Sequence, residues 1–127
     1  MIVGGYAVGF HGHPRYTGDL DIWLLPTQEN AVRIVKAIEL FGFGSFGISE
    51  KDISSKGLVI QLGYPPLRID LLTSIDGVRF EECYPNRRTT EIDGLLINFI
   101  SYDDLIKYKK ASGRHQDLGD IENLQKG

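Results

Sequence analysis

The sequence predicts a single α/β (α+β) domain in which a mixed β-sheet is flanked by helices. Two observations predict this fold class. Apolar segments with strand-like alternation recur along the chain, and segments with helical spacing of apolar residues lie between and after them. A third concerns size, because 127 residues suit one compact core, whereas two domains would each be near the minimum for independent folding. We therefore expect one domain spanning residues 1–127.

The first part of the chain predicts alternating short strands and helical segments. In order, we expect a strand at 1–3, a helical turn at 6–11, a loop at 11–18 and a strand at 20–25 ended by Pro26. The clearest helix follows, because apolar residues recur at helical spacing between Thr27, a suitable N-cap, and Gly42, a suitable end.

The second part predicts a strand pair, a hairpin and two closing helices. Residues 43–56 are expected to be irregular, with a short helical turn near Glu50. We then expect strands at 57–62 and 67–72 around a turn at 63–66, a short helix at 78–83, strands at 87–92 and 95–99, and helices at 103–111 and 118–125. Asp93-Gly94 predicts the hairpin turn, and Gly113 separates the last helices.

Composition excludes several classes of protein. A net charge of −3 and a pI near 5.5 argue against a general nucleic-acid binder, which would be basic. The single cysteine, Cys83, excludes an internal disulfide. No apolar run approaches the roughly 20 residues that span a membrane, and the N-terminus has no basic segment leading into an apolar one. We expect a cytoplasmic protein without a membrane partner. Because an apolar strand follows Met1 at once, we also expect that an N-terminal helix is missing from the chain.

Asp19-Leu20-Asp21 is the first candidate for chemistry. Residues two apart on a strand point to the same face, so both carboxylates would project together. Neighbouring like charges are costly unless a positive charge lies between them, and carboxylate oxygens suit Mg²⁺ or Mn²⁺. The alternative is a loop-to-strand junction with solvated acids. For an Asp-x-Asp motif without other motifs, this alternative is the more frequent case.

Asp70 is the third acid, within the apolar segment Leu67–Leu72. If this strand lies beside the first, three carboxylates converge, enough for a two-metal site with ions roughly 3.5–4 Å apart. The alternative is an exposed acid on an edge strand, paired with Arg68. Gly4-Gly5 adds a place where the backbone could approach a phosphate closely, although a plain tight turn is the better explanation of the pair taken alone.

Taken together, these motifs resemble the DNA polymerase beta-like nucleotidyltransferase superfamily. Its signature is an apolar strand, Gly-Gly or Gly-Ser, a gap, Asp-x-Asp, and a later strand with a third acid between apolar residues. Here these parts are Ile2-Val3-Gly4-Gly5, Asp19-Leu20-Asp21-Ile22 and Ile69-Asp70-Leu71, in order and over most of the chain. The chain looks like the minimal prokaryotic members, some of which are toxins of abortive-infection systems.

The resemblance implies a fold, a reaction and a set of roles. The fold would be a nucleotidyltransferase-like mixed sheet flanked by helices. Asp19, Asp21 and Asp70 would bind Mg²⁺ or Mn²⁺, Asp70 would also serve as a base, and Gly4-Gly5 would hold the triphosphate. A hydroxyl of an RNA, a protein or a small molecule would attack the α-phosphorus of ATP or another NTP and release pyrophosphate.

Basic groups complete the expected nucleotide site. Arg15 could contact a phosphate or be a solvated loop charge. In similar toxins a downstream lysine and aspartate support nucleotide binding, and Lys109 and Asp117 are the matching candidates. The alternatives are a solvated helix face for the lysine and an N-cap for the aspartate.

Three functions fit the sequence. An active nucleotidyltransferase is favoured by the complete set of acids. A non-catalytic, antitoxin-like partner in a toxin–antitoxin pair is favoured by the short length and by the expected lack of a helix over the first strand. The partner of this chain could also be a second copy of itself, in a homo-oligomer. A nucleotide-binding sensor without turnover is disfavoured, because such a sensor need not keep all three acids.

Overall fold

A computed structural model describes residues 1–44 and 47–126 of the chain. Its strands are β1 (Ile2–Val3), β2 (Asp19–Trp23), β3 (Val59–Tyr64), β4 (Leu67–Leu72), β5 (Arg88–Ile92) and β6 (Leu95–Phe99). Its helices are α1 (Gly4–Phe10), α2 (Gln28–Ile38), η1 (Glu39–Phe43), α3 (Glu50–Ser54), α4 (Phe80–Cys83), η3 (Tyr84–Asn86), α5 (Tyr102–Ser112) and α6 (His115–Lys126).

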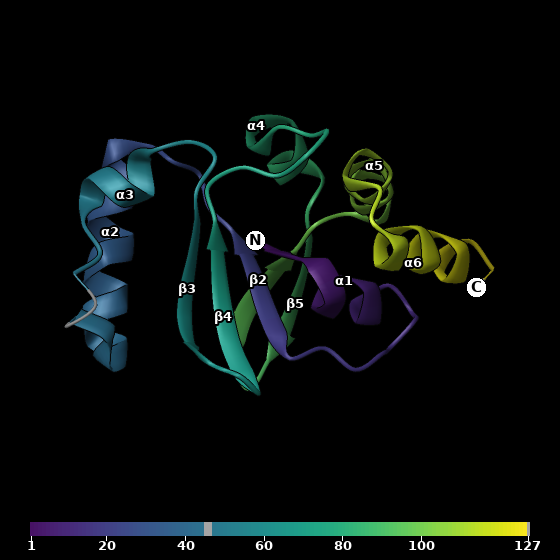
Figure 1. Ribbon diagram of the computed structural model, residues 1–127, viewed down its shortest axis with the longest axis horizontal. Helices are drawn as coiled ribbons and strands as arrows, with labels where there is room; N and C mark the ends of the chain where they lie inside the picture. Colours follow the sequence, from purple (N-terminus) through teal and green to yellow (C-terminus); the bar gives the residue numbers. More distant parts are fainter. Residues whose placement is uncertain (45–46, 127) are drawn as a thin grey trace.

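The strands form one mixed sheet of order β3-β4-β2-β1-β6-β5, with helices on either side (Figure 1). This confirms the expected α+β class with a mixed sheet flanked by helices. The parallel pairs are β2 with β4 and β1 with β6, and the other three pairs are antiparallel. In the described part of the chain, no helix combines the length and the apolar character needed to cross a membrane.

Two separate cores fill the two faces of the sheet. Trp23 and Leu72 pack on one face with residues of α1, α4, α5 and α6. Leu62 and Leu71 pack on the other face with residues of α2 and α3. In Figure 1, α2 and α3 accordingly lie on one side of the sheet, and α1, α5 and α6 lie on the other. The acids of β2 and β4 share the face of Trp23 and Leu72, since side chains alternate along a strand.

Several boundaries differ from the expectation. β2 begins one residue earlier and ends two earlier than the expected strand, and β3 continues into the expected turn because Gly63 and Tyr64 pair with β4. α1 begins at Gly4, so the glycine pair opens a helix instead of forming a separate turn. α6 begins three residues earlier than expected. Residues 45 and 46, inside the segment expected to be irregular, lie outside the described residues.

The expected hairpin turn and the expected separation of the two closing helices are confirmed. Asp93 and Gly94 have φ values of 51° and 81°, which are the left-handed conformations that a two-residue hairpin turn needs. Gly113, with φ of 64°, caps α5 in the left-handed region. Because α5 and α6 follow one another after so short a connection, their facing sides can meet above the acidic face of the sheet.

Candidate active site

The three acids lie on neighbouring strands. β2 and β4 run parallel, and their register places Asp21 opposite Asp70 and Asp19 opposite Arg68. Asp70 is only 8% exposed, and β4 lies between β3 and β2. The alternative of an exposed acid on an edge strand is therefore wrong, whereas the proposed pairing with Arg68 is present.

Arg68 connects two of these acids. Its Nη2 donates to Asp19 Oδ2 at 2.8 Å, and its Nε donates to Asp70 Oδ1 at 2.9 Å. The Asp19 side chain is still 42% exposed, so this acid is open to the solvent on one side. One guanidinium thus balances part of the negative charge at the start of β2 and β4.

Asp21 is the one of the three acids that forms no ion pair with Arg68 in the described part of the chain. Burial raises its pKa to about 6, and the negative charges of Asp70 and Asp19 add to the shift. Among the described residues, no ion pair or hydrogen bond reaches its carboxylate. This shortage of positive charge beside three oxygen-donor groups is what a hard divalent cation would relieve, so the donor set fits Mg²⁺ or Mn²⁺.

The three acids do not form a set of metal ligands in this structure. Among residues 1–44 and 47–126, no three carboxylate, imidazole or thiol groups converge closely enough to hold one ion as they stand. The three backbone positions already share a face, while the side chains of Asp19 and Asp70 are turned to Arg68.

Gly4 and Gly5 pack tightly against the acid-bearing strand and the loop before it. A Cβ at Gly4 would overlap Asp21 Oδ2, and a Cβ at Gly5 would lie 2.8 Å from Thr17 Oγ1. Gly4 also has φ of 71°, a conformation that side chains rarely adopt. The glycine pair therefore lets α1 begin directly beside the carboxylate of Asp21.

We expect Gly4→Ala to lower the free energy of unfolding by about 1–3 kcal/mol, because it adds both backbone strain and an overlap with Asp21. Gly12→Ala is the matched control, since Gly12 has φ of 108° but no heavy atom within 4 Å of an added Cβ. Urea unfolding should show the larger loss for Gly4→Ala. Equal losses would mean that strain alone matters and that the approach to Asp21 is unimportant.

A buried ion cluster lies where α5 faces α6. Lys109 Nζ is 3.1 Å from Asp117 Oδ1 and 2.9 Å from Asp120 Oδ2, and all three side chains are at most 3% exposed. Lys110, in contrast, is exposed. A solvated helix face for Lys109 is thus wrong, and its ammonium joins the two closing helices instead.

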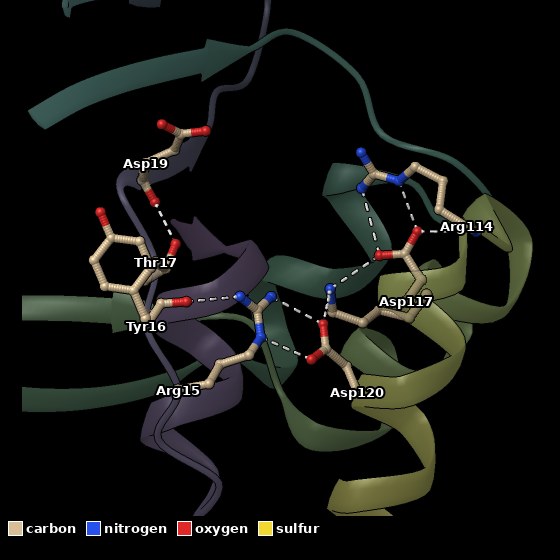
Figure 2. Close-up of polar contacts among 8 residues, drawn as sticks. Arg15, Tyr16, Thr17, Asp19, Arg114, Asp117 and Asp120 are labelled. Carbon is tan, nitrogen blue, oxygen red and sulfur yellow. Dashed lines mark hydrogen bonds and ion pairs between the residues drawn. The ribbon is translucent and has the colours of Figure 1, made fainter. Parts of the chain in front are cut away.

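Two arginines extend this cluster in opposite directions (Figure 2). Arg15, from the loop after α1, donates from Nε and Nη2 to the two oxygens of Asp120 at 2.8 and 3.0 Å. Arg114 donates to Asp117 Oδ2 from both its Nε, at 2.8 Å, and its backbone N–H, at 3.2 Å. Because α6 begins at His115, Asp117 lies in its first turn and is not the N-cap. Arg15 is not a solvated charge, whereas Arg114 remains 70% exposed.

The cluster should make the fold sensitive to acid. Burial alone would raise the pKa of Asp117, but hydrogen bonds from Arg114, Ser112 and Lys109 and the charge of Lys109 lower it to about 2. A lowered folded-state pKa stabilises the fold above the ordinary value near 4, and this contribution is lost as the pH falls towards 2.

We therefore expect the free energy of unfolding to fall by about 2 kcal/mol between pH 4 and pH 2 through Asp117. Urea unfolding at half-unit steps of pH measures this loss. Asp117→Asn has no carboxyl group to protonate there and should show a smaller fall over the same interval. An identical acid dependence in the two proteins would contradict the role of this ion cluster.

A cleft of about 480 Å³ brings the two groups of charges together. Its lining includes all eight residues singled out in the sequence: Gly4, Gly5, Arg15, Asp19, Asp21, Asp70, Lys109 and Asp117. Carboxylates of β2 and β4 line one part of the cleft. Arg15, Lys109 and Arg114 line another part, where each is paired with Asp117 or Asp120. A ligand that carries a cation and several anionic oxygens would meet side chains of both charges in this cleft.

Three further residues of this region are missing from the set expected in the sequence. Asp120 lies one helical turn after Asp117 and thus on the same face of α6, a spacing that could have revealed it. Arg68 lies two residues before Asp70 and shares its face. Arg114 precedes α6 directly, and only the folded chain shows that its guanidinium turns back to Asp117.

Comparison of the sequence with protein-family models gives no match, and comparison with curated proteins gives no significant match. What the cleft does is therefore inferred from its own side chains.

Proposed function

We propose that this protein is a metal-dependent nucleotidyltransferase that moves a nucleoside monophosphate from an NTP to a hydroxyl of an RNA, a protein or a small molecule. Support comes from one observation: carboxylates on two adjacent parallel strands line the same cleft as Arg15, Lys109 and Arg114. The resemblance to the DNA polymerase beta-like superfamily agrees with this proposal at the same residues.

Each group has a role that follows from its position. Asp19, Asp21 and Asp70 would hold Mg²⁺ or Mn²⁺, which would neutralise charge on the reacting phosphate. Arg114, exposed at the mouth of the cleft, is placed to meet phosphate oxygens, and Lys109 fixes the helices that carry it. Gly4 and Gly5 let the start of α1 lie against Asp21 and Thr17, so its backbone would approach a triphosphate bound at the carboxylates. Most of the catalysis would be positioning and charge stabilisation.

The reaction balances within this set of groups. The acceptor oxygen forms a bond to the α-phosphorus, the bond from that phosphorus to the bridging oxygen breaks, and pyrophosphate leaves with the electron pair. The proton of the acceptor hydroxyl passes to a carboxylate of the cleft, which the resemblance identifies as Asp70.

A second candidate is nucleotide binding without turnover. It is favoured by one observation, namely that Arg68 already forms ion pairs with two of the three acids in this structure. The two candidates agree on nucleotide binding and differ in pyrophosphate release.

Titration calorimetry with α,β-methylene analogues of the four NTPs tests the shared part. We expect binding that needs Mg²⁺ or Mn²⁺ and that weakens at least tenfold in Asp70→Asn, which removes one ligand charge at nearly constant volume. Binding of equal strength without metal, or unaffected by Asp70→Asn, would contradict the proposal. Pyrophosphate release from the unmodified NTPs then separates the enzyme from the binding protein.

A further inference from the structure

Arg68 uses the oxygen atoms that the proposed metal ion would need. Its Nη2 donates to Asp19 Oδ2 at 2.8 Å and to Asp70 Oδ2 at 3.2 Å, while its Nε donates to Asp70 Oδ1 at 2.9 Å. One guanidinium thus engages three of the four carboxylate oxygens of two acids. A divalent ion that binds these oxygens competes with the guanidinium for their negative charge.

The surroundings of Arg68 allow it to leave. Across β2 its register partner is Asp19, and across β3 it is Gly63, which has no side chain to hold it. In the described part of the chain its guanidinium donates only to Asp19 and Asp70. The side chain is 25% exposed and lines the cleft, so a ligand there can be reached by rotation of Arg68 about its own bonds.

We propose that Arg68 is an exchangeable counter-ion: without substrate it occupies the carboxylates of Asp19 and Asp70, and when the metal–triphosphate complex binds it moves onto phosphate oxygens. This inference rests on the proposed nucleotidyltransferase function and adds an order of binding to it. The metal alone binds weakly, because it must compete with Arg68. Metal and nucleotide bind well together, because the triphosphate receives the displaced guanidinium.

Charge and geometry favour such an exchange. A guanidinium and a divalent cation repel each other if both remain on the same carboxylates. The planar fork of arginine binds two phosphate oxygens as readily as two carboxylate oxygens, so its hydrogen bonds are replaced when it moves. The exchange couples the affinities for metal and nucleotide, and such couplings commonly reach 5–150-fold.

Mn²⁺ binding without nucleotide, followed by electron paramagnetic resonance, tests the competition directly. We expect Arg68→Gln to bind Mn²⁺ about tenfold more tightly than the wild type. Arg33→Gln is the matched control, since it removes the same charge from the exposed surface of α2 and should leave the affinity unchanged. Unchanged or weaker Mn²⁺ binding by Arg68→Gln would overturn the inference.

Nucleotide binding supplies a readout of opposite sign. At saturating Mg²⁺, Arg68→Gln should bind the α,β-methylene NTP analogues about tenfold more weakly, because the phosphate loses its arginine. A merely structural defect would weaken both metal and nucleotide, whereas the exchange predicts a gain for one and a loss for the other. Nucleotide affinity equal to that of the wild type would also overturn the inference.

A substitute variant and the behaviour of the wild-type protein keep the test decisive. If Arg68→Gln does not fold, as judged by circular dichroism, Arg68→Lys replaces it, because an ammonium cannot grip both acids as a fork does. Tighter Mn²⁺ binding by Arg68→Lys is then expected, and wild-type affinity overturns the inference. If the wild-type protein binds neither Mn²⁺ nor any analogue, the proposed function itself fails. If it transfers nucleotide while the Arg68 variants show no opposite shifts, only the role of Arg68 fails.

Discussion

Replacing Lys109 with methionine is expected to lower the free energy of unfolding by about 3 kcal/mol, a large fraction of the stability of a domain of this size. The ammonium is buried between Asp117 and Asp120, and methionine keeps the length of the side chain but leaves both carboxylates without this partner. The cost comes mainly from buried charge that is no longer compensated. Guanidinium unfolding followed by circular dichroism measures it.

Lys110→Met is the matched control, because Lys110 is the exposed neighbour on the same helix. It should change the free energy of unfolding by no more than about 0.5 kcal/mol. Adding Asp120→Asn to Lys109→Met should recover part of the loss, since it removes one of the uncompensated charges. Equal effects of the two lysine substitutions would show that the ion cluster contributes little to the fold.

Asp21→Asn is expected to reduce nucleotidyl transfer by about 10³-fold or more while stabilising the protein. Activity falls because the substitution removes a charged oxygen donor from the proposed metal site, an electrostatic loss of about 4 kcal/mol in the transition state. Stability rises because the pKa of Asp21 is raised to about 6 by burial and by the charges of Asp70 and Asp19. Removing a charge that the fold disfavours should add about 1–3 kcal/mol at pH 7.

The sign of this gain can be followed with pH. Because the folded-state pKa of Asp21 lies above the ordinary value, the wild type itself gains stability as it takes up a proton between pH 6 and pH 4. The advantage of Asp21→Asn should therefore be largest at neutral pH and disappear near pH 4. Urea unfolding of both proteins without metal measures the difference. A stability difference between the two proteins that does not change with pH, or a less stable Asp21→Asn at pH 7, would contradict the unfavourable burial of this charge.

Local patterns in the sequence predicted residues that line one cleft more completely than they predicted the contacts among those residues. Asp19, Asp21 and Asp70 could be placed on strand faces because side chains alternate along a strand. Their meeting depends on β2 lying beside β4, a long-range pairing that local patterns do not determine and that the fold contains. The glycine pair was placed beside a ligand, but its contact with Asp21 needed the packing of α1.

Most of the ion pairs of the cleft could not be predicted from the sequence, because they join residues that are far apart in the chain. Arg15 and Asp120 are 105 residues apart, so no periodicity connects them. Lys109 could be separated from Lys110 as the inward member of the pair only once α6 supplied two carboxylates to receive it. Arg68 and Asp70 lie two residues apart on one strand, and this spacing indicates their pairing. Arg114 and Asp117 are three residues apart, but their contact depends on α6 beginning at His115, before the helix start expected from the sequence.

Transfer of label from α-labelled NTPs tests the central claim most directly. Wild-type protein and Asp21→Asn are incubated with each NTP and Mg²⁺ or Mn²⁺, in the presence of total RNA or cell lysate, and RNA, protein and small molecules are separated. We expect the label to appear on one class of acceptor with the wild type and to be absent with Asp21→Asn. Label that persists in Asp21→Asn, or no transfer by folded wild-type protein to any class of acceptor, would contradict the claim that the carboxylates of this cleft catalyse nucleotidyl transfer.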